Sequence, residues 1–406
     1  MNFVQKLAAQ VFRIDQPMSP SDRDSFLRVG GGMESSSGAV VNDQTAMKVA
    51  VFWRCVSLIS GAVANLPLDL IERRADDVRA PATGHPLRRV LTVKPNHWQT
   101  PAEFRKYLQT SVLMRGNGYA LIVRTGNAVQ ALIPIHPDRV TVEQGDNLSL
   151  TYRVTTKDGS TRQFPQRDVL HLRGLSLDGF TGLSVISYMR EALGLSLKGE
   201  EATARLFKQG NLAGGYFTHP DKLSQDAYQR LRASLVERAG SGQAHKWDIL
   251  EEGMKPEPLK MNAQDQQFIE LRDLQKYDIA TFMGVPPHLV GLLDKTTSWG
   301  SGIEQQSIGF VIYTLNDWIK TWEETLKRDL LQEAQWETHD FRFYVQGLMR
   351  GDSGARANYY AQALQYRWMN PNEVRALEDM APYSGGDTFL DPPNTAGTPV
   401  GGNDES

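Results

Sequence analysis

The apolar residues of this chain change their spacing twice, and that change constrains the fold more than any other feature. From Val49 to Val63 they recur every three or four residues, which predicts a helix that begins near Thr45 with this residue as its cap. Between Tyr119 and Arg173 the apolar residues alternate with polar ones in short runs separated by Gly, Pro and Asn, which predicts an antiparallel meander of strands. Beyond this region the helical spacing returns. Blocks of strands between blocks of helices are typical of an α+β fold.

Start and stop signals place the other helices. Thr100, Pro101 and Glu103 supply a cap, a first-turn proline and the third residue of a capping box, so a helix is expected from there to about Arg115. Further helices are predicted over 185–209, 224–240 and 263–283, with a small β element formed by 247–250 and 255–260.

The most regular segment of the chain lies between Ile308 and Leu330. Its apolar residues step by four and three while charged residues occupy the rest of the helical wheel, which predicts a long amphipathic helix. Gly309, near its start, is a candidate for a kink. A last helical region is expected over 353–380.

Composition restricts the function classes. Of the 406 residues, 40% are hydrophobic and 22% are charged, so the chain can bury a core. The formal net charge of −3 lacks the basic excess of a free-standing DNA-binding domain, and any contact with nucleic acid is expected to be loose. A single cysteine, Cys55, rules out a disulfide framework within the chain and fits a reducing compartment. With no leader-like N-terminus and no long apolar run, we expect a soluble intracellular product without membrane contact.

The motifs of common enzymes are missing. The sequence has no GxxxxGK[ST] phosphate loop and no HExxH pair, and the stretch from Gly182 to Ile186 lacks the second glycine of a nucleophile elbow. We therefore expect no catalytic, cofactor-binding or metal-binding residues and no cofactor.

From Thr45 to Asp387 the sequence resembles the phage portal protein family, in the form found in long-tailed phages and gene-transfer particles. The resemblance is strongest over 250–328. Within that stretch it rests on Leu250-Glu251-Glu252-Gly253-Met254-Lys255, on the turn Gly284-Val285-Pro286-Pro287-His288-Leu289-Val290-Gly291, and on Ile303-Glu304-Gln305-Gln306-Ser307. It is supported elsewhere by Asn117-Gly118-Tyr119-Ala120, Gly347-Leu348-Met349-Arg350-Gly351-Asp352 and Asn372-Glu373-Val374-Arg375.

The resemblance implies an elongated subunit of a ring of about twelve at one capsid vertex. Its parts would be an antiparallel β-rich wing, a two-helix stem, a small β clip, a tunnel loop, a long amphipathic wing helix and a helical crown. The order of the parts in the family implies the following boundaries. A flexible N-terminal arm would cover 1–44 and the wing 45–221, and stem helices over 222–240 and 263–287 would enclose the clip over 241–262. The tunnel loop would cover 288–302, the long wing helix 303–340, the crown 341–383 and a disordered tail 384–406.

The tunnel loop supplies the candidates for contact with DNA. These are Lys295, Thr296, Thr297, Ser298 and Trp299. In a ring, one lysine per subunit becomes a band of cations that touches phosphates without reading sequence. The alternatives are that Lys295 is a solvated loop residue and that Trp299 packs against a neighbouring subunit.

The clip supplies the candidates for partner docking. These are Trp247, Glu251, Glu252, Lys255 and Lys260. The resemblance implies the terminase large subunit and a head-completion or connector protein as partners, the major capsid protein and possibly a scaffold around the ring, and double-stranded DNA as a transient, sequence-independent ligand. It also implies a place in the virion after assembly in the host cytoplasm, and no enzymatic activity. Two rival hypotheses are another capsid-vertex or head-completion protein and a packaging-associated hydrolase.

Overall fold

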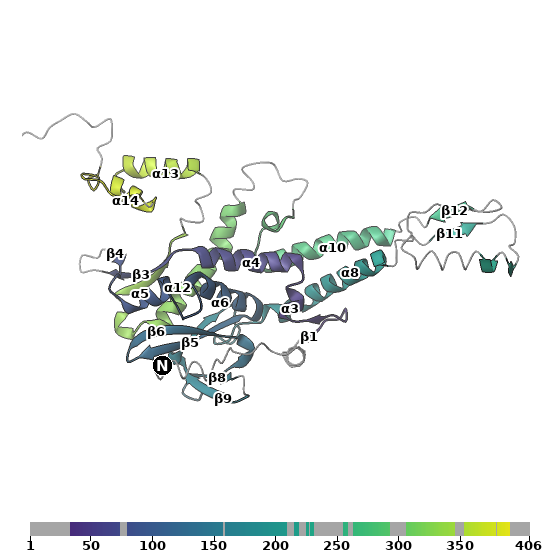
Figure 1. Cartoon of the computed structure of the whole chain (residues 1–406), viewed down its shortest axis with the longest axis horizontal. Coiled ribbons are helices and arrows are strands. Elements are labelled where there is room, and N and C mark those ends of the chain that lie inside the picture. Colours follow the sequence, from purple (N-terminus) through teal and green to yellow (C-terminus); the bar gives the residue numbers. More distant parts are fainter. Residues whose placement is uncertain are drawn as a thin grey trace, which may run out of the picture. The chain divides into compact units, whose positions relative to one another are not determined.

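The computed structural model describes residues 33–73, 79–156, 159–208, 215–218, 225–226, 228–230, 255–258, 263–292, 306–345, 353–378 and 380–389. The chain divides into two compact units, Met1–Phe343 and Tyr344–Ser406. Every strand pair among the described residues is antiparallel, and the strands alternate with blocks of helix. The predicted α+β class is therefore confirmed (Figure 1).

A three-stranded sheet in the order β10-β5-β6 forms the centre of the larger unit. It consists of β5 (Asn117–Thr125), β6 (Ala128–Ile135) and β10 (Val169–Arg173). Helix α6 (Pro101–Arg115) leads into β5 and packs on α4 (Ala50–Asn65). The predicted start of α6 is confirmed, because Thr100 and Glu103 form the reciprocal hydrogen bonds of a capping box.

A second three-stranded sheet runs in the order β7-β8-β9. It contains β7 (Val140–Gln144), β8 (Leu150–Thr155) and β9 (Thr161–Pro165). The prediction of one continuous meander was thus wrong. A 3-10 turn at Pro137–Arg139 interrupts the strands after β6, and the chain returns to β5 only at β10. Side chains of both sheets, including Tyr119 and Tyr152, share one hydrophobic core.

A third sheet joins segments from the two ends of the larger unit. Strand β3 (Leu68–Arg73) pairs with β4 (Arg79–Pro81) and with β13 (His339–Phe343). Helix α5 (Pro86–Thr92) packs on β3 and β6. The elements near 340 differ from their prediction: the long helix expected over 303–340 ends at Leu330, and residues 341–343 lie in β13, in the sheet with β3.

The chain before α4 is more structured than its composition suggested. Strands β1 (Met33–Glu34) and β2 (Val40–Val41) form a hairpin on α8, and the short helix α3 (Asp43–Ala46) follows. Residues 33–44 are thus not part of a flexible arm. Asn42 caps α3 with Thr45 as its capping-box partner, whereas α4 begins after Val49 without a side-chain cap, so Thr45 does not cap the long helix.

Two long helices, one before and one after the small β element, lie side by side (Figure 1). Helices α7 (Val185–Tyr188) and α8 (Arg190–Lys208) replace the single helix expected over 185–209. Helix α10 (Ala263–Phe282) matches its prediction closely and packs on α8, where Arg272 Nη1 donates to Thr203 Oγ1 at 3.1 Å (Figure 1). Helix α8 precedes β11 and α10 follows β12 along the chain, while most of the helix predicted over 222–240 lies outside the described residues.

The small β element also differs from its prediction. Strand β12 (Lys255–Pro258) pairs with β11 (Gly215–Thr218), whereas the other predicted segment of this element, 247–250, lies outside the described residues. Residues 231–254 lie outside the described residues. The strand 215–218, placed in the wing by sequence, belongs to the same β element as the predicted clip.

The long amphipathic helix contains a π-helical turn near its start. Residues Phe310–Leu315 form a π-helix (η4), and α12 (Asn316–Leu330) continues it as a regular α-helix. The irregularity predicted at Gly309 thus occurs in the residues directly after it. Trp322 is buried and its Nε1 donates to Gln109 Oε1 at 2.7 Å, so this tryptophan packs in the core.

The smaller unit contains α13 (Ser353–Gln365) and α14 (Pro371–Leu377). Asn372 on α14 holds the following segment: its Nδ2 donates to Tyr383 O at 3.0 Å and to Asp387 Oδ1 at 2.9 Å. The expected disordered tail from 384 is corrected accordingly, because 384–387 pack against α14. Residues 390–406 lie outside the described residues.

A fully buried histidine links the central sheet to the second one. Both ring nitrogens of His171 on β10 form hydrogen bonds. Nδ1 lies 3.1 Å from Tyr152 Oη, and Nε2 lies 2.9 Å from Asn117 Oδ1. Because Asn117 Oδ1 can only accept, Nε2 carries the proton and Nδ1 accepts from the tyrosine hydroxyl. The pattern fits a neutral ring, and burial lowers the pKa of His171 well below its ordinary value of 6.5.

We expect the free energy of unfolding to decrease when the pH falls below 6.5, the ordinary pKa of histidine. Above that pH the ring is neutral in both states. Below it, this residue binds a proton in the unfolded chain but stays neutral in the folded protein. The free energy of unfolding therefore falls by up to about 1.4 kcal/mol per pH unit until the lowered pKa is reached. Denaturant titrations at about pH 7 and about pH 5 should show a larger loss of stability in the wild type than in His171→Gln. Equal pH dependence of the two proteins would contradict this assignment.

Candidate functional site

The turn after α10 is held by its backbone conformation. Gly284 has a φ of +66°, and a Cβ there would lie 3.1 Å from Thr314 Oγ1, so glycine suits this position. Pro286 and Pro287 follow, and the chain forms the 3-10 turn η3 (Pro287–Val290). The residues 288–290, predicted as the start of the tunnel loop, are thus part of a short helix.

Three contacts fix this turn to the rest of the larger unit. Arg54 Nε on α4 donates to Leu289 O at 3.1 Å. His288 Nε2 lies 3.2 Å from Ser307 Oγ, and Thr314 Oγ1 donates to Gly284 O at 2.5 Å. The last two contacts join the chain before residue 293 to the chain after residue 305, so the two ends of the predicted tunnel loop meet on a fixed base.

The tunnel-loop candidates themselves cannot be placed. Lys295, Thr296, Thr297, Ser298 and Trp299 lie outside the described residues. What the structure places is the base that carries them, formed by η3 and η4. On η4, Phe310 and Leu315 are buried, whereas Ile312 and Tyr313 are exposed, the latter to 82%.

Of the five docking candidates, only Lys255 is described. It begins β12 and is paired with Thr218 on β11. Trp247, Glu251, Glu252 and Lys260 lie outside the described residues, so the structure does not bring the five together.

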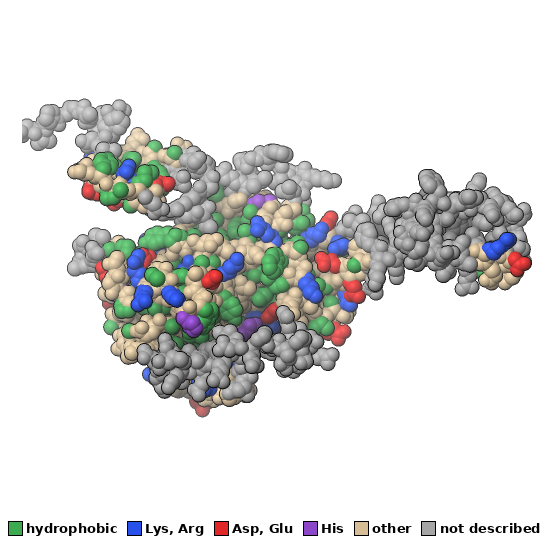
Figure 2. Space-filling model, in the orientation of Figure 1, with side chains coloured by type: hydrophobic (Ala, Val, Ile, Leu, Met, Phe, Trp, Pro, Cys, Tyr) green, Lys and Arg blue, Asp and Glu red, His purple; other side chains and the backbone are tan. Residues whose placement is uncertain are grey.

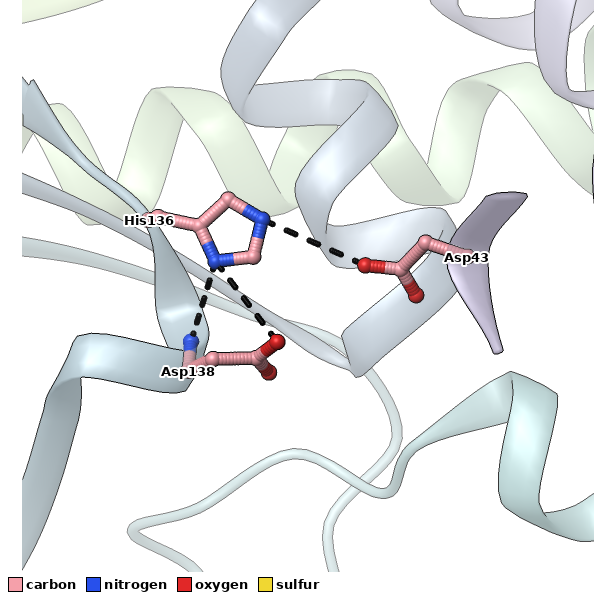
Figure 3. A group of neighbouring side chains, drawn as sticks. All are labelled: Asp43, His136 and Asp138. Carbon is pink, nitrogen blue, oxygen red and sulfur yellow. Dashed lines mark hydrogen bonds and ion pairs between the residues drawn. The ribbon is translucent and has the colours of Figure 1, made fainter. Parts of the chain in front are cut away.

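A cluster of Asp43, His136 and Asp138 has the residue types of a metal site (Figure 3). Its chemistry is already satisfied in another way. Arg115 lies 2.9 Å from Asp43 Oδ1 and 2.9 Å from Asp138 Oδ2, so a guanidinium bridges the two carboxylates. Burial raises the pKa of Asp43, and the charge of Arg115 opposes that shift. We assign the cluster as an ion-pair junction between α3, α6 and the turn after β6, and not as a metal centre.

The surface that sequence reasoning missed is the loop 174–183, which follows β10. It carries two leucines, Leu175 and Leu177, that are 79% and 80% exposed. The sequence does contain a signal for this surface: two large apolar residues lie in a stretch rich in Gly, Ser and Asp, where no helical or strand pattern would bury them.

Comparison with known proteins identifies the class of the chain. A family profile described as "Phage portal protein" matches residues 50–379. The portal protein of Enterobacteria phage HK97 is 33% identical over 354 residues, which cover 86% of this chain and 83% of that protein. The probable portal protein of Streptomyces phage phiC31 is 29% identical over 365 residues, covering 87% and 79%.

Solved structures share the fold. A chain from the virion of a native gene transfer agent particle aligns with a TM-score of 0.58 at 20% identity, covering 88% of this chain and 99% of that chain. An HK97-family phage portal protein from Corynebacterium diphtheriae aligns with a TM-score of 0.54 at 18% identity, covering 77% and 98%. A chain from the neck of a native gene transfer agent particle, computed with C12 symmetry, gives 0.55 at 20% identity, covering 94% and 100%.

These matches place the protein among the structural proteins of phage-like particles. The chain belongs to the phage portal protein family, as its sequence resemblance implied. Membership in this family also makes it a structural protein and not an enzyme. Among the helices in the described part of the chain, none combines the length and the apolar character needed to cross a bilayer.

Proposed function

We propose that this chain is the portal subunit of a tailed double-stranded-DNA phage or a related gene-transfer particle, and that it forms the ring through which DNA enters and leaves the capsid. The observation that carries the proposal is the family match over residues 50–379, which runs through the wing sheets, the α8–α10 pair, the loop base and α14. A match of this length covers the whole architecture and not one module.

Exposed aromatic side chains support assembly into a ring of about twelve copies. Trp53 on α4, Tyr188 on α7 and Tyr313 on η4 are all more than half exposed in the isolated chain. Figure 2 shows hydrophobic side chains interspersed with charged ones on one face of the larger unit. Contacts between copies would bury such groups. The similarity to a neck structure with C12 symmetry agrees with this number.

We assign the parts of the subunit to the observed elements. The three sheets with α4, α5 and α6 would make up the wing, α8 and α10 the stem, and β11 with β12 the clip. We assign η4 and α12 to the wing helix and the unit from Tyr344 onward to the crown, and the predicted tunnel loop to the chain between η3 and η4, which lies outside the described residues.

A conduit has to let DNA slide. Tight binding of phosphates would stall it, and the net charge of −3 agrees with loose contact. We assign Lys295 and its neighbours up to Trp299 to the channel, where one lysine per subunit becomes a ring of weak, sequence-independent phosphate contacts.

The clip is the proposed docking site for the terminase large subunit and later for a head-completion or connector protein, while the wing faces the major capsid protein or a scaffold. Among the described residues β11 and β12 form a sheet of two strands, and the edge of such a sheet can bind a partner strand. Pro256 and Pro258 have no N–H to donate, so β12 is a poor edge for an added strand and β11 is the better one. The assembled ring would reside in the virion after assembly in the host cytoplasm.

Electron microscopy of the purified full chain tests the proposal. End-on views should show rings of about twelve subunits with an axial hole. Single subunits without rotational symmetry, at every concentration tried, would contradict the ring and favour the head-completion alternative. Metal-dependent cleavage of DNA by the pure protein would favour the hydrolase alternative.

Replacement of Lys295 by alanine tests the channel assignment. We expect particles assembled with Lys295→Ala to package DNA at a rate reduced by roughly twofold or more, because a band of phosphate contacts is removed from every subunit at once. Lys94→Ala, which removes an exposed lysine from the chain just after α5, serves as the matched control and should package normally. Normal packaging by Lys295→Ala would remove lysine from the channel and support the solvated-loop alternative.

A further inference from the structure

The helix pair α8–α10 carries four exposed apolar side chains. Leu195 on α8 is 42% exposed, and Leu271, Leu274 and Phe282 on α10 are 45%, 57% and 54% exposed. Single exposed apolar residues are common on protein surfaces, whereas several on one side of a helix pair are typical of an interaction surface. We refer to these four residues as the α8–α10 face.

The geometry of the pair places the exposed residues of both helices on one side. The side-chain hydrogen bond between α8 and α10 marks where the two antiparallel helices meet (Figure 1). From that contact, a rotation of about 80° in one sense around each helix leads to a buried residue, Leu193 on α8 and Ala280 on α10. The same rotation in the other sense leads to an exposed residue, Leu195 and Phe282. Because the helices are antiparallel, equal senses of rotation lead to the same side of the pair.

The described chain begins close to this face. Met33 opens β1, the β1–β2 hairpin packs on α8, and Arg190 Nη1 lies 3.9 Å from Met33 Sδ. Ser36 N donates to Glu191 Oε2 at 2.9 Å and fixes the hairpin to the same part of the helix. Leu195 lies about 7 Å further along α8 than Arg190. Whatever precedes Met33 therefore leaves the hairpin near the α8–α10 face.

Residues 1–32 lie outside the described residues, but their sequence contains an apolar pattern. Phe3, Leu7, Val11 and Ile14 follow one another at steps of four, four and three, which predicts an amphipathic helix. Polar and charged residues stand between them: Gln5, Lys6, Gln10 and Arg13. A helix this short is marginal on its own in water, so it needs an apolar surface to pack on.

The dimensions of the segment and of the face agree. From Phe3 to Ile14 the predicted helix would be about 16 Å long, and the exposed residues of α10 from Leu271 to Phe282 cover the same length. The intervening residues 15–32 are rich in Ser, Asp and Gly, and a linker of this length and composition would span roughly 23 Å. That reach is sufficient to lay the helix on a face that lies next to Met33.

We propose that residues 3–14 form a helix whose apolar side packs on the α8–α10 face of the same chain. The inference goes beyond the proposed ring and does not depend on it, since both surfaces belong to one subunit. A third helix laid along the pair would bury the exposed leucines and Phe282 by ordinary helix packing. The tether favours the same chain over a second copy, because a linked segment is present at an effective concentration on the order of millimolar.

Crosslinking between engineered cysteines in the full chain tests the contact. Asp278 is exposed on α10 between Leu274 and Phe282, so Asp278→Cys places a thiol on the face. The native Cys55 is buried, and burial raises its pKa to about 12, so it stays unreactive. A short bifunctional thiol reagent should join the chain carrying Leu7→Cys and Asp278→Cys to itself roughly fivefold faster than the chain carrying Ala9→Cys and Asp278→Cys. The reason is that residues 7 and 9 point to opposite sides of the predicted helix.

A second pair of variants tests the choice of surface. Leu274→Asp/Phe282→Asp, added to the Leu7→Cys/Asp278→Cys chain, should lower the crosslinking rate to that of the Ala9→Cys chain. Leu148→Asp, at a residue 73% exposed in the turn between β7 and β8, is the matched control and should leave the rate unchanged.

Three results would overturn the inference: equal rates from residues 7 and 9, no loss of rate with Leu274→Asp/Phe282→Asp, or a product that joins only different chains. The product is read from the mass of the denatured chain. The result is therefore independent of ring formation, which electron microscopy of the same protein reports separately.

Discussion

Gly182→Ala is expected to lower the free energy of unfolding by roughly 3 kcal/mol or more, since it forces overlap between two stretches of backbone. A Cβ at residue 182 would lie 1.9 Å from Gly116 O and 3.1 Å from Gly174 N. Neither atom belongs to a side chain that can rotate away. The structure can relieve the overlap only by moving β5 or by releasing the end of the loop 174–183.

The neighbouring hydrogen bonds raise the cost of such a movement. Gly182 N and Gly182 O both bond to the side-chain amide of Asn117, at 2.8 Å each. A shift of residue 182 would break this pair and expose the buried end of Asn117, whose Oδ1 also accepts from His171. Leaving buried polar groups unpaired adds to the steric penalty.

Denaturant titration followed by circular dichroism measures the effect. Gly61→Ala is the control: Gly61 lies inside α4, and a Cβ there would contact nothing within 4 Å. Removing a glycine from a helix interior should leave stability unchanged or raise it by up to about 1 kcal/mol. A Gly182→Ala protein as stable as the wild type would mean that the close approach of residues 116 and 182 is not required.

Local signals in the sequence were sufficient for elements that are stabilised locally. The capping box of Thr100 and Glu103 fixed the start of α6, and the alternation of the apolar residues located β5, β6, β7, β8 and β10. Strand β9 was missed because its residues are mostly polar and partly exposed, so its place depends on pairing with β8 and not on its own pattern.

Contacts between distant segments left no comparable signal. The pairing of β13 with β3 joins residues about 270 positions apart, and the pairing of β11 with β12 was not suggested by any turn signal. The choice of α8 as the partner of α10 is of the same kind. The sequence resemblance supplied an order of parts, but a plan carried over by order cannot say which of two candidate helices makes the contact.

The same difference between local signals and distant contacts applies to the candidate sites. Lys295 and its neighbours were chosen by their position in the family plan, and they lie outside the described residues. The base of their loop depends on contacts such as that between His288 and Ser307, which only coordinates reveal. The loop 174–183 was missed because its rigidity comes from Gly116 and Asn117, far away in the sequence.

Asp329→Ala is expected to destabilise the larger unit by roughly 3 kcal/mol, because it leaves a buried donor and a charge without their partner. The Asp329 side chain is only 3% exposed at the end of α12. Its Oδ2 accepts from His171 N at 3.0 Å, and Oδ1 accepts from Arg328 Nε at 2.7 Å. Arg328 Nη2 also donates to His171 O at 2.8 Å, so the two side chains together bind both backbone groups of one residue in β10.

Two further variants separate charge from hydrogen bonding in this contact. Asp329→Asn keeps an acceptor for His171 N but removes the charge opposite Arg328, and it should cost less than the alanine change, about 1–2 kcal/mol. Asp317→Ala, on an exposed position of the same helix, should stay within about 0.5 kcal/mol of the wild type. Denaturant titrations of all three variants give the comparison. If Asp329→Ala unfolds like Asp317→Ala, then α12 is held to β10 by apolar packing alone. If the losses in free energy of unfolding instead follow the expected order, with Asp329→Ala largest and Asp317→Ala smallest, a buried carboxylate fixes the long helix to the central sheet.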